Sequence, residues 1–303
     1  MFTTPILLII FNRPDKVERL INSLRSVKPT KVYVSADGPR ENVATDHSRC
    51  DRARAVVSQI DWPCEVFTNF HEYNTGADFG PEKAINWFFD NVDEGIILED
   101  DCIAHPDFFR FAKEMLSRYR ANDQVMMISG NNFQNEIIRG DGSYYFSKYP
   151  STWGWASWRR AWMHYDTRIS GYREFTDRNI LDTICQSPAE KKYWTKFFEK
   201  INSGELNHWD IKWIFAVWNN NGISITPNVN LVQNIGFGND ATHTFTHDDT
   251  MVVRAVELGE ITHPSTTIVD KKADAYLFEH VYKFTLIKRF FYLIELIKRR
   301  LTR

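Results

Sequence analysis

The chain has little cysteine, no long apolar run and no excess of positive charge. Its four cysteines, among 303 residues, are widely spaced and form no C-x-x-C pair. A zinc site or a disulfide framework is therefore not expected, and reduced thiols favour a cytoplasmic location. The formal charge of -2 lacks the basic excess that is typical of general nucleic-acid binders. No stretch approaches the roughly 20 apolar residues that cross a bilayer.

Aromatic residues are abundant instead. They make up 15% of the chain, with 10 Trp, while hydrophobic residues reach 43% and charged residues 25%. These values indicate a globular protein with one large domain or two modest ones. Trp and Tyr offer flat apolar faces with a polar group, which suits sugar or peptide surfaces as well as core packing.

Apolar strands alternate with helical stretches over the first 130 residues. We expect strands at Pro5–Phe11, Lys31–Ala36, Cys64–Thr68, Gly95–Glu99 and Val125–Ser129. Helices are expected at 14–27, 52–59, 107–120 and from Gly80-Pro81 to Asn91, with Pro81 in the first turn. This alternation predicts an α/β fold with a mostly parallel sheet and helices on both faces. Ligands of such sheets bind beyond the carboxyl ends of the strands.

Three consecutive carboxylates, Glu99-Asp100-Asp101, follow directly after an apolar strand. Ionised groups near a core lose hydration and repel one another, and a divalent cation removes both costs. Oxygen ligands suit Mg²⁺ or Mn²⁺, either of which would hold a diphosphate. An acidic surface loop is the competing interpretation. Asn12-Arg13 and Asp37 also follow strands, so the three segments are expected to meet at one edge of the sheet.

The second half contains aromatic motifs and a glycine loop. Trp153-Gly154-Trp155 is followed by Trp209-Asp210 and by Gly236-Phe237-Gly238-Asn239. Asp210 is a candidate catalytic base, and a helix N-cap is the alternative. Glycines let backbone N–H groups approach a phosphate closely. His243, in the same loop, is a candidate metal ligand, although a packing or solvent-facing histidine explains it equally well.

Taken together, these motifs resemble the GT-A glycosyltransferases, specifically the N-acetylglucosaminyltransferase I-like group and its bacterial relatives. The resemblance covers about residues 5 to 245. It implies a Rossmann-like GT-A fold, a nucleotide-sugar donor (most often a UDP-sugar), a divalent metal and inversion at the anomeric carbon. The acceptor would be a glycan or a lipid-linked glycan.

The resemblance also implies roles for individual residues. Asp101 would bind the metal, Asp37 would accept a hydrogen bond from uracil N3–H, and Asp210 would be the base. The remaining donor contacts would come from Asn12, Arg13, Glu99, Asp100, Gly236 and Gly238. Trp153, Trp155 and Trp209 are candidates for the wall of the sugar or acceptor site.

Residues 1–130 would form the donor-binding half, residues 131–265 the acceptor-binding and catalytic half, and residues 266–303 a C-terminal extension. A sugar-1-phosphate nucleotidyltransferase is an alternative enzyme, but it usually carries a glycine-rich loop after the first strand, and Phe11-Asn12-Arg13-Pro14 contains no glycine. A non-catalytic carbohydrate-binding protein is a third possibility.

Residues 282–303 predict a basic amphipathic helix. Its apolar positions recur every three or four residues: Leu286, Ile287, Phe290, Leu293, Ile294, Ile297 and Leu301. Its basic residues lie mainly on the opposite side: Lys288, Arg289, Arg299 and Arg300. This pattern favours a peripheral position on the inner face of an anionic membrane. Packing on the catalytic domain or on a dimer partner is the alternative.

Overall fold

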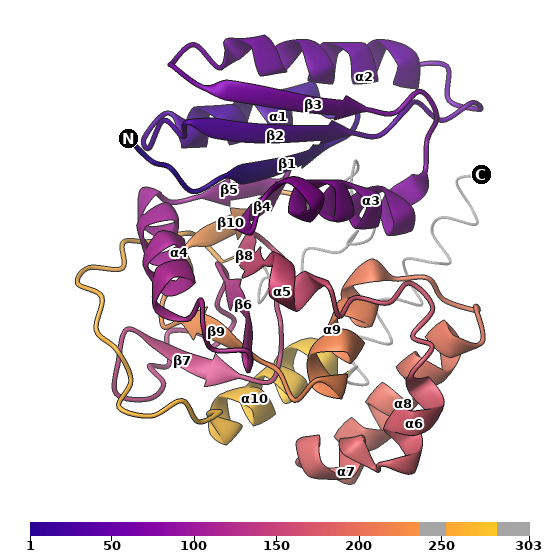
Figure 1. Cartoon of the computed structure of the whole chain (residues 1–303), viewed down its shortest axis with the longest axis vertical. Helices are drawn as coiled ribbons and strands as arrows, with labels where there is room; N and C mark the ends of the chain where they lie inside the picture. The colour runs from indigo at the N-terminus through magenta and orange to yellow at the C-terminus, as the bar shows by residue number, and fades with distance from the viewer. Residues whose placement is uncertain (237–252, 284–303) are drawn as a thin grey trace.

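The computed structural model describes residues 1–236 and 253–283. An eight-stranded sheet in the order β3-β2-β1-β4-β8-β6-β9-β7 runs through the molecule (Figure 1). Its strands are β1 Ile6–Ile10, β2 Lys31–Ala36, β3 Glu65–Phe70, β4 Glu94–Glu99, β6 Val125–Ser129, β7 Tyr144–Ser147, β8 Trp155–Trp158 and β9 Ile223–Pro227. The short strands β5 Cys102–Ala104 and β10 Val232–Asn234 pair with each other.

Two of the sheet strands, β8 and β7, run opposite to the rest. β1 pairs in parallel with β2 and β4, and β6 pairs in parallel with β9, whereas β8 is antiparallel to both β4 and β6. β7 is antiparallel to β9 at the edge. The predicted α/β fold with a mostly parallel sheet is therefore confirmed.

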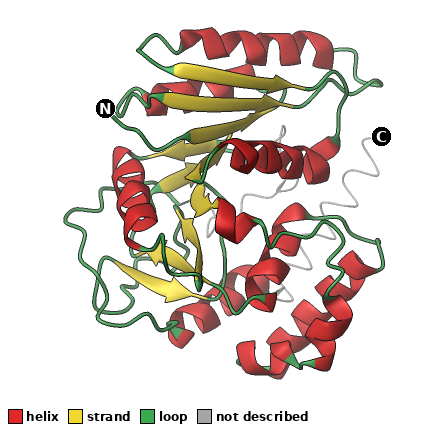
Figure 2. Cartoon of the chain, in the orientation of Figure 1, coloured by secondary structure: helices red, strands yellow, loops and turns green. Residues whose placement is uncertain are grey.

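Helices cover both faces of the sheet (Figure 2). Side chains of β1 alternate between the two faces of the sheet: Ile6 and Leu8 belong to one core cluster and Leu7 to the other. Both faces are therefore apolar and are covered by helices. The first cluster includes side chains of α1 Pro14–Leu24 and α4 Pro106–Arg118. Helices that contribute to the second include α3 Gly76–Asn91, α5 Arg159–Trp162, α6 Tyr172–Asp177, α7 Ile180–Ile184, α8 Pro188–Asn202 and α9 Trp209–Asn219.

The second half of the chain extends the sheet of the first half. Strand β8, which contains Trp155, inserts between β4 and β6, where Trp155 pairs with Ile97. Trp155 is 1% exposed and lies among the side chains of the second core cluster. The predicted donor and acceptor halves thus share one continuous sheet.

Two helices begin earlier than the sequence pattern predicts. α2 spans Asp46–Ala55 and leads into the 3₁₀ turn η1, Val56–Gln59. α3 begins at Gly76, so Pro81 lies inside the helix instead of in its first turn. Proline lacks the N–H that would bond to the preceding turn, so the helix has one backbone hydrogen bond fewer at this position.

The C-terminal part of the described chain packs against the rest of the fold. α10, Lys271–Leu277, continues into the π-helical turn η2, Phe278–Tyr282. The predicted amphipathic helix, Gly238 and His243 lie outside the described residues, apart from Tyr282 and Lys283 at the start of that helix. None of the described helices combines the length and hydrophobicity that crossing a membrane requires.

Candidate active site

A cavity of about 1030 Å³ opens at the carboxyl ends of β1, β2 and β4. It brings together most of the predicted site residues that the structure describes: Asn12, Arg13, Asp37, Glu99, Asp100, Asp101, Trp153, Trp209, Asp210 and Gly236 all line it. Parallel strands place their exits at one edge of the sheet, which explains why segments far apart in the sequence meet here.

Arg13 neutralises part of the acidic triplet. Its Nη2 and Nε donate to the two oxygens of Asp100, the latter at 3.2 Å, and its Nη1 donates to Asp101 Oδ2 at 3.0 Å. Asp100 is 2% exposed, so this bidentate pair removes the cost of an unpaired buried charge. Asp101 is more accessible, with 14% of its side chain exposed.

The single positive charge of Arg13 does not balance the three carboxyl groups of the triplet. Burial, together with the charges of Asp101 and Asp100, raises the pKa of Glu99 to about 8. Burial also raises the pKa of Asp100, although Arg13 opposes that shift. Additional positive charge in the cavity would therefore favour the ionised form of Glu99.

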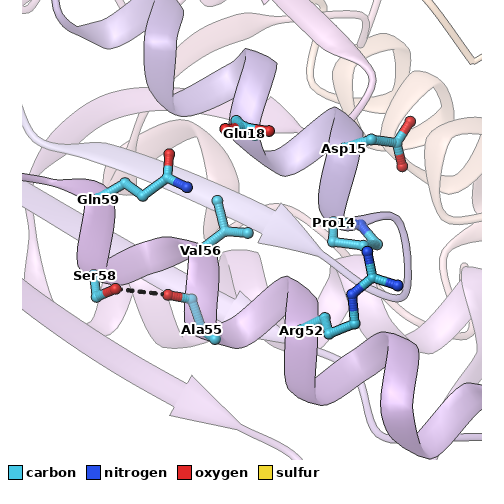
Figure 3. Close-up of a pocket in the computed structure, with 8 residues that line it drawn as sticks. All are labelled: Pro14, Asp15, Glu18, Arg52, Ala55, Val56, Ser58 and Gln59. Carbon is cyan, nitrogen blue, oxygen red and sulfur yellow. Dashed lines mark hydrogen bonds between the residues drawn. The ribbon is translucent and has the colours of Figure 1, made fainter.

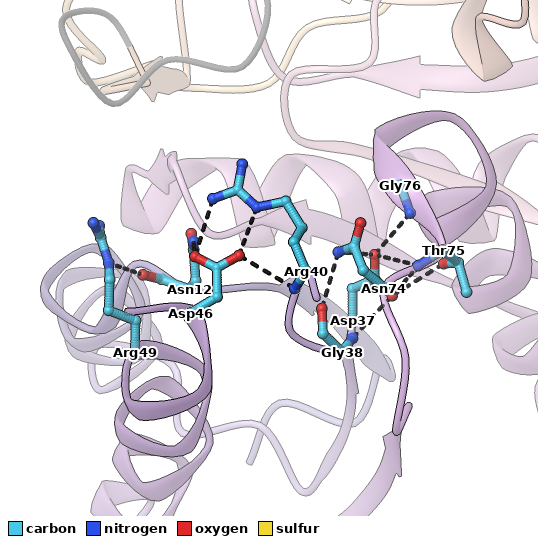
Figure 4. Close-up of polar contacts among 9 residues, drawn as sticks. All are labelled: Asn12, Asp37, Gly38, Arg40, Asp46, Arg49, Asn74, Thr75 and Gly76. Carbon is cyan, nitrogen blue, oxygen red and sulfur yellow. Dashed lines mark hydrogen bonds and ion pairs between the residues drawn. The ribbon is translucent and has the colours of Figure 1, made fainter. Parts of the chain in front are cut away.

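Asp37 is fully engaged by the loop before α3. Its two carboxylate oxygens accept hydrogen bonds from the backbone N–H groups of Thr75 and Gly76 at 2.9–3.0 Å and from Asn74 Nδ2 at 3.0 Å. The N–H of Gly38 and the Thr75 hydroxyl add further bonds (Figure 4). Asp37 thereby caps α3 from another strand end. The predicted contact with uracil stays a prediction.

A second polar group lies beside the end of β1. Asp46, which is 1% exposed, accepts from Asn12 Nδ2 at 2.8 Å and from Arg40 Nε at 2.5 Å. Figure 4 shows these three residues joined, with Arg49 Nε donating to the Asn12 carbonyl at 2.9 Å. Hydrogen bonds, those from Arg40 foremost, lower the pKa of Asp46 to about 2.

This arrangement fixes the Asn12 amide. Because an ionised carboxylate only accepts, the nitrogen must face Asp46, and the amide oxygen accepts no hydrogen bond from a described residue. The sequence pattern did not identify Arg40, Asp46 or Arg49, since α2 carries no apolar stripe that would have placed its N-terminus.

Asp210 lines the cavity from the first turn of α9. The N-cap of that helix is His208, so the alternative interpretation of Asp210 as the cap is wrong. Its Oδ1 accepts a hydrogen bond from the adjacent Ile211 N–H at 3.0 Å. The charge of Asp210 is close enough to contribute to the raised pKa of Glu99.

His208 and Asp78 connect α9 with α3 at the cavity wall. His208 Nδ1 lies 3.5 Å from Asp78 Oδ1, and both residues line the cavity. The sequence predicted no role for either residue, because two helix starts separated by some 130 residues give no pattern that links them.

The predicted aromatic wall divides into two groups. Trp153 and Trp209 line the cavity, and Trp153 meets Phe133 edge-on with ring centroids 5.3 Å apart. Trp155 lies behind Trp209, with ring centroids 6.3 Å apart, and does not line the cavity. This corrects the expectation for Trp155, whose strand β8 is central in the sheet and buries its side chain.

A smaller pocket of about 360 Å³ lies between α1 and the α2–η1 segment (Figure 3). It is lined by Pro14, Asp15, Glu18, Arg52, Ala55, Val56, Ser58 and Gln59. Mixed charges and a local Ser58–Ala55 hydrogen bond give it no evident chemistry.

No family model and no curated protein sequence matches the chain. Solved structures that resemble it include Staphylococcus aureus TarS residues 1–349, with 10% identity and a TM-score of 0.42, over 75% of this chain and 58% of that one. GlyE, a glycosyltransferase of Streptococcus pneumoniae TIGR4, has 11% identity and a TM-score of 0.35, over 74% and 45% of the two chains. A UDP-glucose pyrophosphorylase bound to UDP-glucose has 7% identity and a TM-score of 0.36, over 74% and 90%.

The similar structures thus include glycosyltransferases and nucleotidyltransferases. The chain spans little more than half of the TarS structure and less than half of the GlyE structure.

Proposed function

We propose that the protein is an inverting, metal-dependent glycosyltransferase that moves a hexosyl or N-acetylhexosaminyl group from a nucleotide sugar to a glycan acceptor. A UDP-sugar is the proposed donor, and a lipid-linked glycan is one acceptor of this class. The observation that carries the proposal is one cavity that combines the Arg13–acid cluster, an amide and guanidinium group near β1, and Asp210 on the facing helix.

The nucleotide would lie along the ends of β1 and β2. Arg40 lies over the Phe11 ring, with the guanidinium 5.5 Å from the ring centroid, and Arg49 lines the same wall. Asn12 contributes an amide oxygen that can accept an N–H of a nucleobase. These donors and acceptors suit the polar edge of a base and the charge of a nucleotide.

Asp101 fits a cation that takes most of its ligands from the substrate. Within the described residues, no group of three or more His, Cys, Asp and Glu could hold a metal ion. Mg²⁺ and Mn²⁺ commonly use one or two carboxylates plus phosphate oxygens and water, so a single accessible carboxylate is sufficient. The excess negative charge that raises the pKa of Glu99 also favours a cation here. When bound, it would supply positive charge to the leaving diphosphate.

The backbone near β10 supports the same position. A Cβ added to Gly236 would lie 2.3 Å from Asp101 Oδ2, so a side chain at this position would have to displace the Asp101 carboxylate. Gly236 N–H donates to Asn234 Oδ1 at 2.6 Å, which holds the turn. A diphosphate beside Asp101 would therefore lie against backbone as well as side chains.

Asp210 would remove the proton from the acceptor hydroxyl as the new bond forms at the anomeric carbon. Its neighbours Trp209 and Ile211 give this wall a partly apolar character. Glu99 would contact the donor sugar, and Trp153 with Trp209 would pack against a sugar ring. One carboxylate that acts on the face opposite the leaving group is what inversion needs.

The test is a panel of UDP-, GDP-, CMP- and dTDP-sugars incubated with the full chain, with and without Mn²⁺. Metal-dependent release of the nucleotide, a nucleoside diphosphate from UDP-, GDP- and dTDP-sugars and CMP from CMP-sugars, supports the proposal. Pyrophosphate formed from a sugar-1-phosphate and a nucleoside triphosphate would instead identify a nucleotidyltransferase. Absence of both reactions and of donor binding in a thermal-shift screen would overturn the proposal.

A further inference from the structure

The two edge strands of the large sheet, β7 and β3, differ in whether their outer sides are paired. The edge strand β7 is covered by the segment before α10, where Asp270 N–H donates to the Phe146 carbonyl at 2.8 Å and Val269 bridges Phe146. At the other edge, β3 pairs with β2, and no described residue pairs with its outer side. A bare edge strand is a template for a further strand.

The ladder between β2 and β3 determines which residues of β3 face outward. Glu65 N–H donates to the Thr30 carbonyl and His71 N–H to the Ala36 carbonyl, both at 2.9 Å. Backbone groups alternate in direction along a strand, so the odd-numbered residues of β3 bond to β2. The residues that direct both N–H and C=O outward are Val66, Thr68 and Phe70.

The side chains of β3 are exposed on both faces of this edge. Val66, Phe67 and Phe70 are 37–39% exposed. Phe67 stacks on Tyr33 with ring centroids 4.6 Å apart, on the side of α3. Phe70 lies on the side of α2, where the Arg54 guanidinium is 5.3 Å from its ring centroid. Apolar surface therefore flanks the unpaired backbone above and below.

We propose that β3 pairs with β3 of a second copy of this chain, antiparallel, about a two-fold axis at Thr68. Hydrogen-bonded pairs join residues whose backbone faces outward in both copies, which gives Thr68 opposite Thr68 and Val66 opposite Phe70. A shift by one residue would set outward groups against inward ones, and a shift by two would leave outward groups unpaired. With the axis at Thr68, the outward N–H and C=O groups of Val66, Thr68 and Phe70 are all paired.

The side chains fit the same alignment. Phe67 of one copy lies opposite Asn69 of the other, and the Glu65 carboxylate lies opposite the His71 imidazole, so no like charges face each other. His71 also lines the large cavity, so the interface reaches the cavity rim. This inference goes beyond the proposed reaction and does not depend on it.

The association is expected to be weak. Pairing six-residue strands buries less surface than the roughly 1,600 Å² of a standard interface, so we expect a dimer populated at about 100 µM protein. Sedimentation velocity of the full chain over a range of concentrations measures it. A protein that stays monomeric over the whole range would overturn the proposal.

Substitutions at the axis locate the interface. Thr68→Pro removes the outward N–H and leaves the ladder to β2 intact, since proline is tolerated where that N–H is unpaired. Thr68→Lys places two ammonium groups together on the axis and keeps the N–H. We expect the dissociation constant to rise roughly tenfold or more in both variants, because each change acts twice in a symmetric dimer.

Thr68→Val is the matched control, because it keeps the N–H, the size and the strand propensity, and its dissociation constant should stay within about twofold of the wild type. Melting temperature and far-ultraviolet circular dichroism check that each variant folds. If Thr68→Pro misfolds, Thr68→Lys still decides, and high salt should restore part of its association. A dimer that persists unchanged in a folded Thr68→Lys variant places the interface elsewhere and refutes the proposal.

Discussion

Arg13 provides positive charge that stabilises the carboxylates at the end of β4. Its guanidinium binds both oxygens of Asp100, which is nearly buried, and one oxygen of Asp101, which is not. The two aspartates therefore differ in their contacts with Arg13. Asp100 holds the guanidinium in place with both oxygens, whereas Asp101 is bound through Oδ2 and its Oδ1 makes no hydrogen bond to Arg13.

This difference predicts the effect of Asp101→Ala. The variant should fold, because Arg13 keeps its pair with Asp100, and it should lose Mn²⁺-dependent binding of UDP. Calorimetric titration of UDP in Mn²⁺ measures the loss, with Asp61→Ala as a control, since Asp61 pairs with Arg25 at the surface. Unchanged affinity in Asp101→Ala would exclude Asp101 as the metal ligand.

Asp210→Asn tests the base. The amide keeps the shape of the side chain and cannot take a proton, so we expect turnover to fall roughly a hundredfold or more while donor affinity is kept. The rate is measured as metal-dependent transfer to an acceptor. Until an acceptor has been identified, metal-dependent hydrolysis of the donor is measured instead. Since His208 is the N-cap of α9, the melting temperature should change little. Full activity in the variant would remove Asp210 from the mechanism.

At the scale of elements, α3 depends on a carboxylate from β2's end. Asp37→Ala removes the acceptor of the Thr75 and Gly76 N–H groups, so we expect a loss of about 1–2 kcal/mol in the free energy of unfolding. Asp37→Asn keeps one acceptor and should lose less. Chemical denaturation measures both variants.

Binding separates this structural role from a contact with uracil. Weaker binding of UDP with unchanged binding of pyrophosphate supports the uracil contact. Equal weakening of both ligands would show that Asp37 acts by shaping the loop between β3 and α3.

α10 is joined to β7 through a buried carboxyl group. Asp274 accepts from Ser147 Oγ at 2.5 Å, and burial raises the pKa of Asp274 to about 7 from an ordinary value of 3.8. The folded state therefore binds the proton more tightly than the unfolded state. The stability that this provides is complete below about pH 4 and is lost as pH rises through 7.

Asp274→Asn should remove this pH dependence. Between pH 4 and pH 8 the wild type should lose on the order of 4 kcal/mol relative to the variant. Urea unfolding at several pH values measures the two slopes. In the variant, the Asn amide nitrogen and the Lys148 N–H are both donors, so their hydrogen bond is lost. This cost in the free energy of unfolding is the same at every pH, and the slopes of stability against pH are therefore compared. Parallel pH profiles would show that Asp274 is not the titrating group.

For the molecule as a whole, the first half of the fold follows from its sequence. Lys31–Ala36 and Val125–Ser129 are strands with the predicted bounds, because continuous apolar runs in an α/β alternation leave little choice. The start of α3 could not be predicted, since its cap is Asp37, nearly forty residues away. The start of α2 was missed because its sequence, DHSRCDRARA, has no apolar periodicity.

The site divides in the same way. Strand exits are local in sequence, so Asn12, Arg13 and the acidic triplet could be assigned to one edge of the sheet. The Asp46–Arg40 pair and the His208–Asp78 contact join different elements through side chains, and only the folded chain reveals them. Trp155 was misassigned because a Trp-rich segment looks alike whether its strand lies in the centre of a sheet or at a cavity.

The C-terminal segment provides a test of membrane association. Tyr282 packs against Tyr149 and Trp194, with ring centroids 4.9 and 5.1 Å apart, so a deletion should begin at residue 284 to leave this contact intact. We expect the full chain to float with anionic liposomes at low salt and the 1–283 form to remain behind, because apolar insertion and basic charge are both lost. Equal flotation of the two forms would contradict this expectation.

The indole rings behind the cavity have a spectroscopic consequence. Trp209 forms part of the cavity wall and stacks on Trp155, which in turn lies within 6.1 Å, centroid to centroid, of Trp162 and Trp213. Chromophores this close exchange excitation energy and couple their transitions. A ligand that touches Trp209 alone would therefore alter the emission and near-ultraviolet dichroism of the whole group, which makes occupancy of the cavity measurable by light without any attached label.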